Sequence, residues 1–110
     1  MPSSAATPGD RPFVVTLVVD LPVGKLDALD VIAFVADGEV VGAGTAAPRV
    51  PLGSRSWAEV EIPRFGDPPP LAVDVFSTVS LEDARHESLR LRAALEAVGW
   101  TVRDPRSGEA

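Results

Sequence analysis

The sequence predicts an α+β domain, in which a five- to six-stranded, mostly antiparallel sheet carries one long C-terminal helix packed on it. Short β-branched runs separated by Pro- and Gly-containing turns fill most of the chain and indicate strands. A single stretch with clear helical periodicity follows near the end. The chain has 110 residues, 45% of them hydrophobic, which is enough for a core without disulfides.

The composition excludes several classes of function. The chain has no cysteine, so thiol nucleophiles, redox-active thiols and cysteine-ligated metals are excluded. A formal net charge of −6 opposes binding to phosphate backbones and to anionic membrane surfaces. No apolar run is long enough to span a bilayer, and the first residues do not form a secretory signal. We expect a cytoplasmic protein that needs no cofactor or metal and binds neither nucleic acid nor membranes.

A single domain is predicted over residues 12–103. Residues 1–11 are small, polar and contain Pro and Gly, which is typical of a disordered lead, and residues 104–110 form a polar tail. The domain opens with Phe13–Val19, which is β-branched and apolar on both faces. This pattern predicts a strand buried on both sides.

The fold depends on residues 25–45, which allow two structures. In the first, two strands are joined by a type I′ turn at Asp37-Gly38, the strongest short-range hairpin signal. In the second, a helix runs from Lys25 to Asp37 and ends at Gly38. The hairpin is the preferred prediction, because the segment is rich in β-branched residues and no capping side chain opens the helix. The helix would give a ferredoxin-like βαββαβ order with an extra strand.

The second half of the chain is more regular. Residues 46–55 are punctuated by Pro and Gly and are predicted to be a loop, whereas residues 57–63 alternate like a half-exposed edge strand. A helix is expected from Leu81 to Val98, because Ser80 is a good N-cap and Gly99 a good C′ residue. Two further short strands are expected, at residues 71–76 and 100–102.

The best candidates for partner binding lie on the 57–63 strand and on the helix. Trp57 shares the predicted solvent-exposed side of its strand with Glu59 and Glu61. There it either anchors an interface or caps the end of the core. On the helix, Arg85 and Arg92 could bind carboxylates of a partner, although salt bridges on a solvated face are the preferred explanation for them.

Two further residues could form a polar site. Asp74 interrupts an apolar strand and shares a face with Phe76, so it is either a solvated side chain or a buried carboxylate that needs a partner. His86 is the only histidine, and it falls on the polar side of the predicted helix. A small-ligand-binding domain or a minimal enzyme would use these carboxylate, Arg and His86 groups.

Other motifs give little support to catalysis. Residues 42–47 fit the loose dinucleotide pattern G-x-G-x-x-A, but Pro48 and Pro51 follow where that pattern requires a helix. No nucleophile–base set or metal cluster stands out. The sequence therefore favours, over a minimal enzyme, a non-catalytic protein-interaction or accessory module that binds a protein partner or itself through a sheet edge or helix face.

Overall fold

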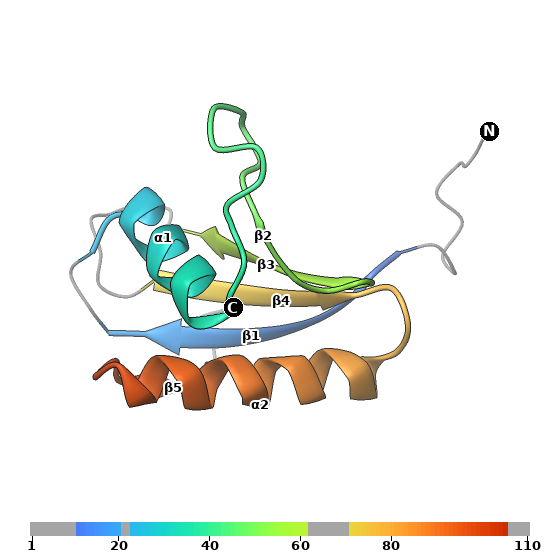
Figure 1. Cartoon of the computed structure of the whole chain (residues 1–110). Coiled ribbons are helices and arrows are strands. Elements are labelled where there is room, and N and C mark those ends of the chain that lie inside the picture. Colours follow the sequence, from blue (N-terminus) through green and yellow to red (C-terminus); the bar gives the residue numbers. More distant parts are fainter. Residues whose placement is uncertain (1–10, 21–22, 62–70, 106–110) are drawn as a thin grey trace.

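The computed structural model describes residues 11–20, 23–61 and 71–105. Its strands form one antiparallel sheet in the order β2-β3-β4-β1-β5, which confirms the predicted α+β class (Figure 1). The elements along the chain are β1 (Phe13–Val19), α1 (Lys25–Val35), β2 (Val50–Gly53), β3 (Ser56–Glu61), β4 (Leu71–Ser77), α2 (Leu81–Ala97) and β5 (Val102–Arg103).

Both helices cover the same face of the sheet. α2 packs on β1 and β4, α1 packs on β2 and β3, and the helices also contact each other. A single hydrophobic core lies between the two layers, built from every second residue of the strands and from one side of each helix. Its fully buried members include Leu29, Ile32, Val60, Val73 and Leu95.

The topology matches the ferredoxin-like βαββαβ order with one extra strand. β1 lies between β4 and β5 and is antiparallel to both, and β4 pairs on its other side with β3. β2 is the addition, since it follows α1 and extends the sheet beyond β3. This arrangement is the one that the helical alternative for residues 25–45 implies.

The preferred hairpin over residues 25–45 is therefore wrong. Residues Lys25–Val35 are helical, and the predicted strand over 39–45 is reduced to an isolated bridge between Val41 and Arg49. The helix begins at Gly24 without a side-chain cap, although Asp27 in the first turn favours the helix dipole. Burial of Ala28, Leu29, Ile32 and Ala33 against the sheet outweighs the β-propensity of the segment.

The Asp37-Gly38 pair ends this helix instead of turning a hairpin. Asp37 adopts the left-handed conformation with φ 56°, and the Gly38 N–H donates to the carbonyl of Ala33 at 2.9 Å. The Asp37 N–H donates to the carbonyl of Phe34 at 3.3 Å. These two bonds form a Schellman motif, in which only Asp37 has the positive φ that a type I′ turn would require of both residues.

The predicted loop and edge strand also need correction. Residues 46–55 include β2, which pairs with β3, so the Trp57 strand is not at the edge of the sheet. Pro51 lies on the true edge strand, as expected for a residue that lacks an N–H. The predicted strand extended to Pro63, but Ile62 and Pro63 lie outside the described residues.

The C-terminal helix is confirmed, including both caps. The Ser80 Oγ accepts a hydrogen bond from the Asp83 N–H at 2.9 Å, and Gly99 has φ 96° at C′. The Trp100 N–H closes the C-terminal turn by donating to the carbonyl of Leu95 at 3.0 Å. The polar tail that follows is described only as far as Pro105, and the predicted N-terminal lead only at Arg11.

Burial along β1 is uneven, which the sequence did not predict. Leu17, Val18 and Val19 are buried, although Val18 points to the opposite face from the other two. Phe13 and Val14, at the start of the strand, are 43% and 45% exposed. The prediction of a strand buried on both sides therefore holds only for the C-terminal half of β1.

Candidate functional site

One face of the sheet is covered by neither of the two described helices, and we call it the helix-free face. The alternation of side chains along β1, β3 and β4 places one set of residues on it. This set consists of Val14, Thr16, Val18, Trp57, Glu59, Glu61, Ala72, Asp74 and Phe76.

An aromatic pair lies at one end of this face. Trp57 on β3 is the register partner of Phe76 on β4, and the two rings stack with centroids 5.3 Å apart and planes at 12°. The guanidinium of Arg49 lies 4.8 Å from the centroid of the Trp57 ring, within range of a cation–π contact. Trp57 is partly exposed and is not part of the core between the layers.

Two carboxylates lie beside the aromatic pair. Glu59 and Asp74 are register partners on neighbouring strands, and both are partly buried. Glu59 accepts a hydrogen bond from the indole N–H of Trp57 at 2.8 Å, and Asp74 accepts one from the Thr16 hydroxyl at 2.7 Å. Neither forms an ion pair with a described residue. This part of the face therefore presents negative charge next to aromatic surface.

The structure brings Trp57, Glu59 and Asp74 together with two residues that the sequence analysis did not single out for function. Phe76 could have been found, because it lies two residues from Asp74 on the same side of a strand. Arg49 could not, because it falls in a predicted loop and reaches Trp57 only through the pairing of β2 with β3. Glu61 lies on the same face and is exposed.

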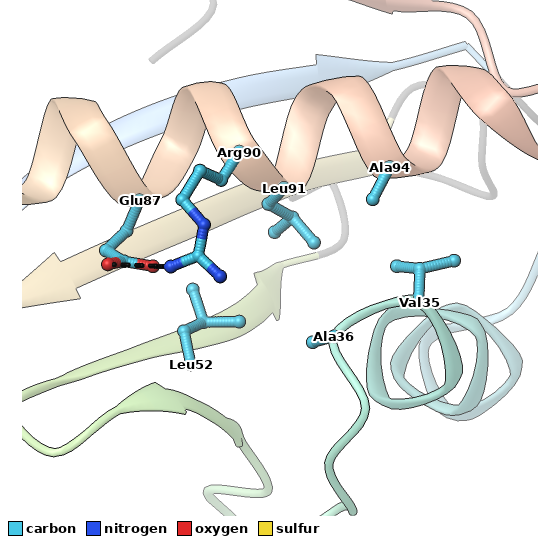
Figure 2. Close-up of a pocket in the computed structure, with 7 residues that line it drawn as sticks. All are labelled: Val35, Ala36, Leu52, Glu87, Arg90, Leu91 and Ala94. Atoms are coloured by element: carbon cyan, nitrogen blue, oxygen red, sulfur yellow. Dashed lines mark hydrogen bonds and ion pairs between the residues drawn. The ribbon is translucent and has the colours of Figure 1, made fainter.

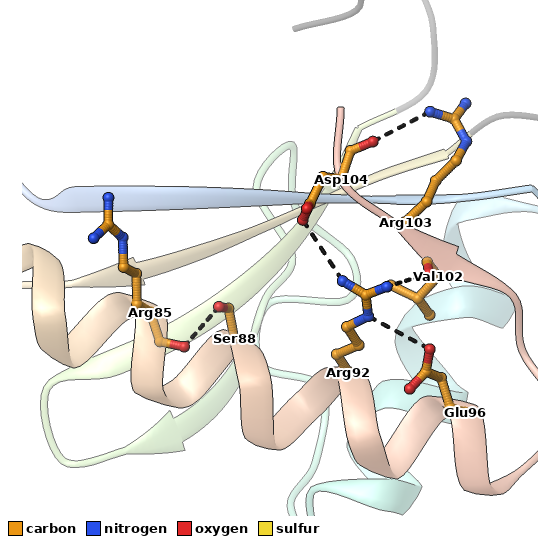
Figure 3. A network of polar contacts seen from close by, with 7 residues as sticks. All are labelled: Arg85, Ser88, Arg92, Glu96, Val102, Arg103 and Asp104. Atoms are coloured by element: carbon orange, nitrogen blue, oxygen red, sulfur yellow. Dashed lines mark hydrogen bonds and ion pairs between the residues drawn. The ribbon is translucent and has the colours of Figure 1, made fainter. Parts of the chain in front are cut away.

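The two arginines of α2 that the sequence singled out, Arg85 and Arg92, lie elsewhere, and they differ in role (Figure 3). The Arg92 guanidinium donates to the carbonyl of Val102 at 2.9 Å and lies 3.4 Å from Glu96 and 3.6 Å from Asp104, so it holds α2 to the β5 segment. The Arg85 side chain is exposed and pairs with no described residue. Of the two, only Arg85 remains free to meet a partner.

Asp74 and His86 do not converge. Asp74 lies on the helix-free face, whereas His86 is exposed on α2, which packs on the other face. His86 makes no hydrogen bond or ion pair with the described part of the chain. Arg90, one turn further along α2, pairs with Glu87 at 2.9 Å. The geometry therefore does not assemble a site from these two groups.

A hollow of about 120 Å³ lies between the end of α1, β2 and α2 (Figure 2). Its apolar lining comes from Val35, Ala36, Leu52, Leu91 and Ala94, and the ion pair of Glu87 with Arg90 closes one side. Pockets for drug-sized ligands usually measure about 300–1,000 Å³. This hollow is smaller, and none of the predicted site residues lines it.

Within residues 11–20, 23–61 and 71–105, no group of three or more His, Cys, Asp or Glu side chains could hold a metal ion. Neither described helix is long and apolar enough to cross a membrane. Comparison with known proteins found no family model, no curated protein and no solved structure that matches the chain.

Proposed function

We propose that the protein is a non-catalytic protein-interaction module whose binding surface is the helix-free face. The observation that carries this proposal is the stacked pair of Trp57 and Phe76, which lies partly exposed on a sheet face that neither described helix covers. Tryptophan is one of the residues most enriched among the side chains that carry the binding energy of protein interfaces. A sheet face that neither described helix covers, with such a pair on it, is a suitable docking surface for a partner.

The charges beside the pair indicate the chemistry of the partner. Glu59 and Asp74 lie side by side and form no ion pair with a described residue, and Glu61 adds a third carboxylate on the same face. Arg49 already places its guanidinium over the Trp57 ring, so a cationic side chain of a partner would pair with these carboxylates beside the aromatic pair. A protein segment with an Arg or Lys next to an apolar side chain would satisfy both features.

The environment of the protein is part of the same proposal. The cysteine-free composition and the acidic net charge of −6 support a cytoplasmic protein that does not bind nucleic acid. The small-ligand or minimal-enzyme alternative has less support, because Asp74 and His86 lie on different sides of the sheet and the hollow beside α2 contains neither.

The proposal is tested by selecting peptides from a random displayed library on the immobilised full chain. We expect the selected peptides to be enriched in Arg or Lys next to Leu, Phe or Trp. Their affinity should fall at least about tenfold for Trp57→Ala and for Glu59→Gln, as expected for an anchor and a paired charge. Titration by calorimetry measures both changes.

Leu89→Ala is the matched control, because Leu89 is exposed on α2, away from the helix-free face. It should leave peptide binding unchanged. Trp57→Phe separates ring stacking from the indole hydrogen bond, and circular dichroism checks that every variant is folded. Peptides that bind Trp57→Ala and Glu59→Gln as well as the unaltered chain would overturn the assignment of this face.

A further inference from the structure

The two edges of the sheet are protected very differently. At the β2 edge, Arg49 and Val41 exchange main-chain hydrogen bonds of 2.7 and 2.9 Å, and Pro51, the next residue that points outward, has no N–H to offer. At the other edge, β5 pairs only with Val18 and Val19. The stretch of β1 from Phe13 to Leu17 therefore has no described strand on its outer side.

The hydrogen-bond pattern identifies which main-chain groups point outward there. Main-chain groups in antiparallel strands point alternately to the two neighbouring strands. The Thr78 N–H donates to the carbonyl of Arg55 at 3.0 Å, so the even-numbered residues of β4 point to β3 and the odd-numbered ones to β1. The β1 partners of the odd-numbered β4 residues include Phe13, Val15 and Leu17, so their main-chain groups point to β4. The main-chain groups of Val14 and Thr16 point outward, away from the sheet.

This edge has the properties of a pairing site. It offers two N–H donors and two carbonyl acceptors, on Val14 and Thr16, and no charged side chain lies between Phe13 and Leu17. Phe13 and Val14 are among the exposed large apolar residues, as is Leu81, at the start of α2. Edge strands are usually protected by charge, proline or a bulge, and this segment has none of these.

We infer that the outer edge of β1 binds a second copy of this chain, so that two sheets join through an antiparallel pair of β1 strands. A twofold axis at Val15 places Val14 of each copy opposite Thr16 of the other. Both outward donors and both outward acceptors of each copy are then used, which makes four main-chain hydrogen bonds. Pro12 bounds the free segment at one end and the pairing with β5 bounds it at the other, so the segments of the two copies have the same length and can pair end to end.

Charges on α2 favour the same occupant. The helix α2 runs alongside β1 (Figure 1). It begins at Leu81, four residues after Ser77, which is the register partner of Phe13. Further along α2, Arg92 donates to the carbonyl of Val102 in β5. The twofold axis therefore brings the N-terminal halves of the two α2 helices together in antiparallel fashion. Arg85, exposed and unpaired among the described residues, then approaches the acidic first turn of the other copy, where Glu82 is exposed. Two such pairs would form in each dimer.

This inference goes beyond the proposed function, because the surface is the strand edge and not the helix-free face. Joining β1 strands about a twofold axis places both helix-free faces on the same side of one continuous sheet. The dimer would thus present two copies of the Trp57–Phe76 pair to a partner, but either property can hold without the other.

A single cysteine tests the register of the pairing, because the natural chain has none. In the inferred dimer, Val15 faces its own copy in a non-hydrogen-bonded pair, with Cα atoms about 4.5 Å apart. That distance allows a disulfide. We expect Val15→Cys to form a covalent dimer as the main species after mild oxidation. Phe13→Cys is the matched control, since Phe13 is more exposed but would lie opposite Leu17 of the other copy, and it should stay uncrosslinked.

Sedimentation equilibrium over a concentration series measures the association itself. The unaltered chain should show a reversible dimer. Val14→Pro removes an N–H that points outward and takes no hydrogen bond from the pairing with β4, so it should lose the dimer while keeping its circular dichroism spectrum. Arg85→Glu and Glu82→Arg should each weaken the dimer at least about tenfold, and the double variant should restore it. These two variants leave β1 intact, so they decide the matter even where Val14→Pro fails to fold.

Several outcomes would overturn the inference. One is a single-chain mass at every concentration. Another is crosslinking of Phe13→Cys to the same extent as Val15→Cys. A third is a dimer that persists unchanged both in folded Val14→Pro and in the two single charge variants, which would place self-association on another surface.

Discussion

At the scale of single residues, the pairing of Thr16 with Asp74 shows how the structure accommodates a carboxylate within an apolar strand. Asp74 is partly buried, and the hydroxyl of Thr16, its register partner on β1, donates to it at 2.7 Å. The sequence left open whether Asp74 is buried or exposed. It lies between these cases, on the helix-free face, with a neutral hydrogen-bond donor and no described cation beside it.

Replacing Thr16 by Val should therefore lower the free energy of unfolding by about 1 kcal/mol, because a partly buried carboxylate loses its donor while the shape of the side chain is kept. Urea denaturation measures the change. In a double-mutant cycle with Asp74→Ala, the two substitutions should be non-additive. Strict additivity would mean that the hydroxyl and the carboxylate stabilise the fold independently.

At the scale of elements, the two helices end in the same way with different residues. Both have a Schellman motif, in which the left-handed position is occupied by Gly99 after α2 and by Asp37 after α1. Aspartate tolerates this conformation better than most residues, whereas alanine does so poorly. The end of α1 therefore depends on a residue at position 37 that tolerates positive φ, a requirement that the hydrophobic pattern of the helix does not reveal.

The Asp37→Ala variant should lose about 1 kcal/mol of stability, since a Cβ without a polar group is strained at positive φ. Asp37→Gly should not lose stability, because glycine adopts this conformation without strain. Thermal unfolding followed by circular dichroism compares the two variants. Equal losses in both would indicate that the carboxylate, and not the backbone conformation, is what this position requires.

At the scale of the whole molecule, one core between the sheet and the two helices stabilises the fold. Leu29 of α1 is 0% exposed within this core, whereas Phe34, five residues further along the same helix, is 79% exposed. A strand over the same residues would distribute burial by alternation and not by helical turns. Burial of two adjacent pairs one turn apart, Ala28 with Leu29 and Ile32 with Ala33, is therefore the signature of the packed helix.

Truncation of these two side chains should have very different effects. Leu29→Ala should cost about 2–5 kcal/mol, because it leaves a cavity in the core. Phe34→Ala should change stability by less than about 0.5 kcal/mol despite the larger side chain, because little of it is buried. Guanidinium denaturation of both variants checks this, and a large loss for Phe34→Ala would argue that another surface covers this side of α1.

The sequence by itself determined the features that depend on neighbouring residues. Ser80 and Gly99 mark both ends of α2 because capping is a local interaction. Alternation along β3 places Trp57, Glu59 and Glu61 on one face, so most of the candidate site was predictable as a set of residues on a strand. The α+β class followed from the same local patterns.

Only the tertiary structure decided the features that depend on distant pairing. Residues 25–35 suit a strand or a helix, and the helix forms because its buried side fits the sheet built by later strands. Likewise, the contacts of Trp57 with Phe76 and of Asp74 with Thr16 exist only once strand order and register are set, and so does the edge of β1 that has no described strand beside it. Register couples residues far apart in the chain, so no local pattern specifies it.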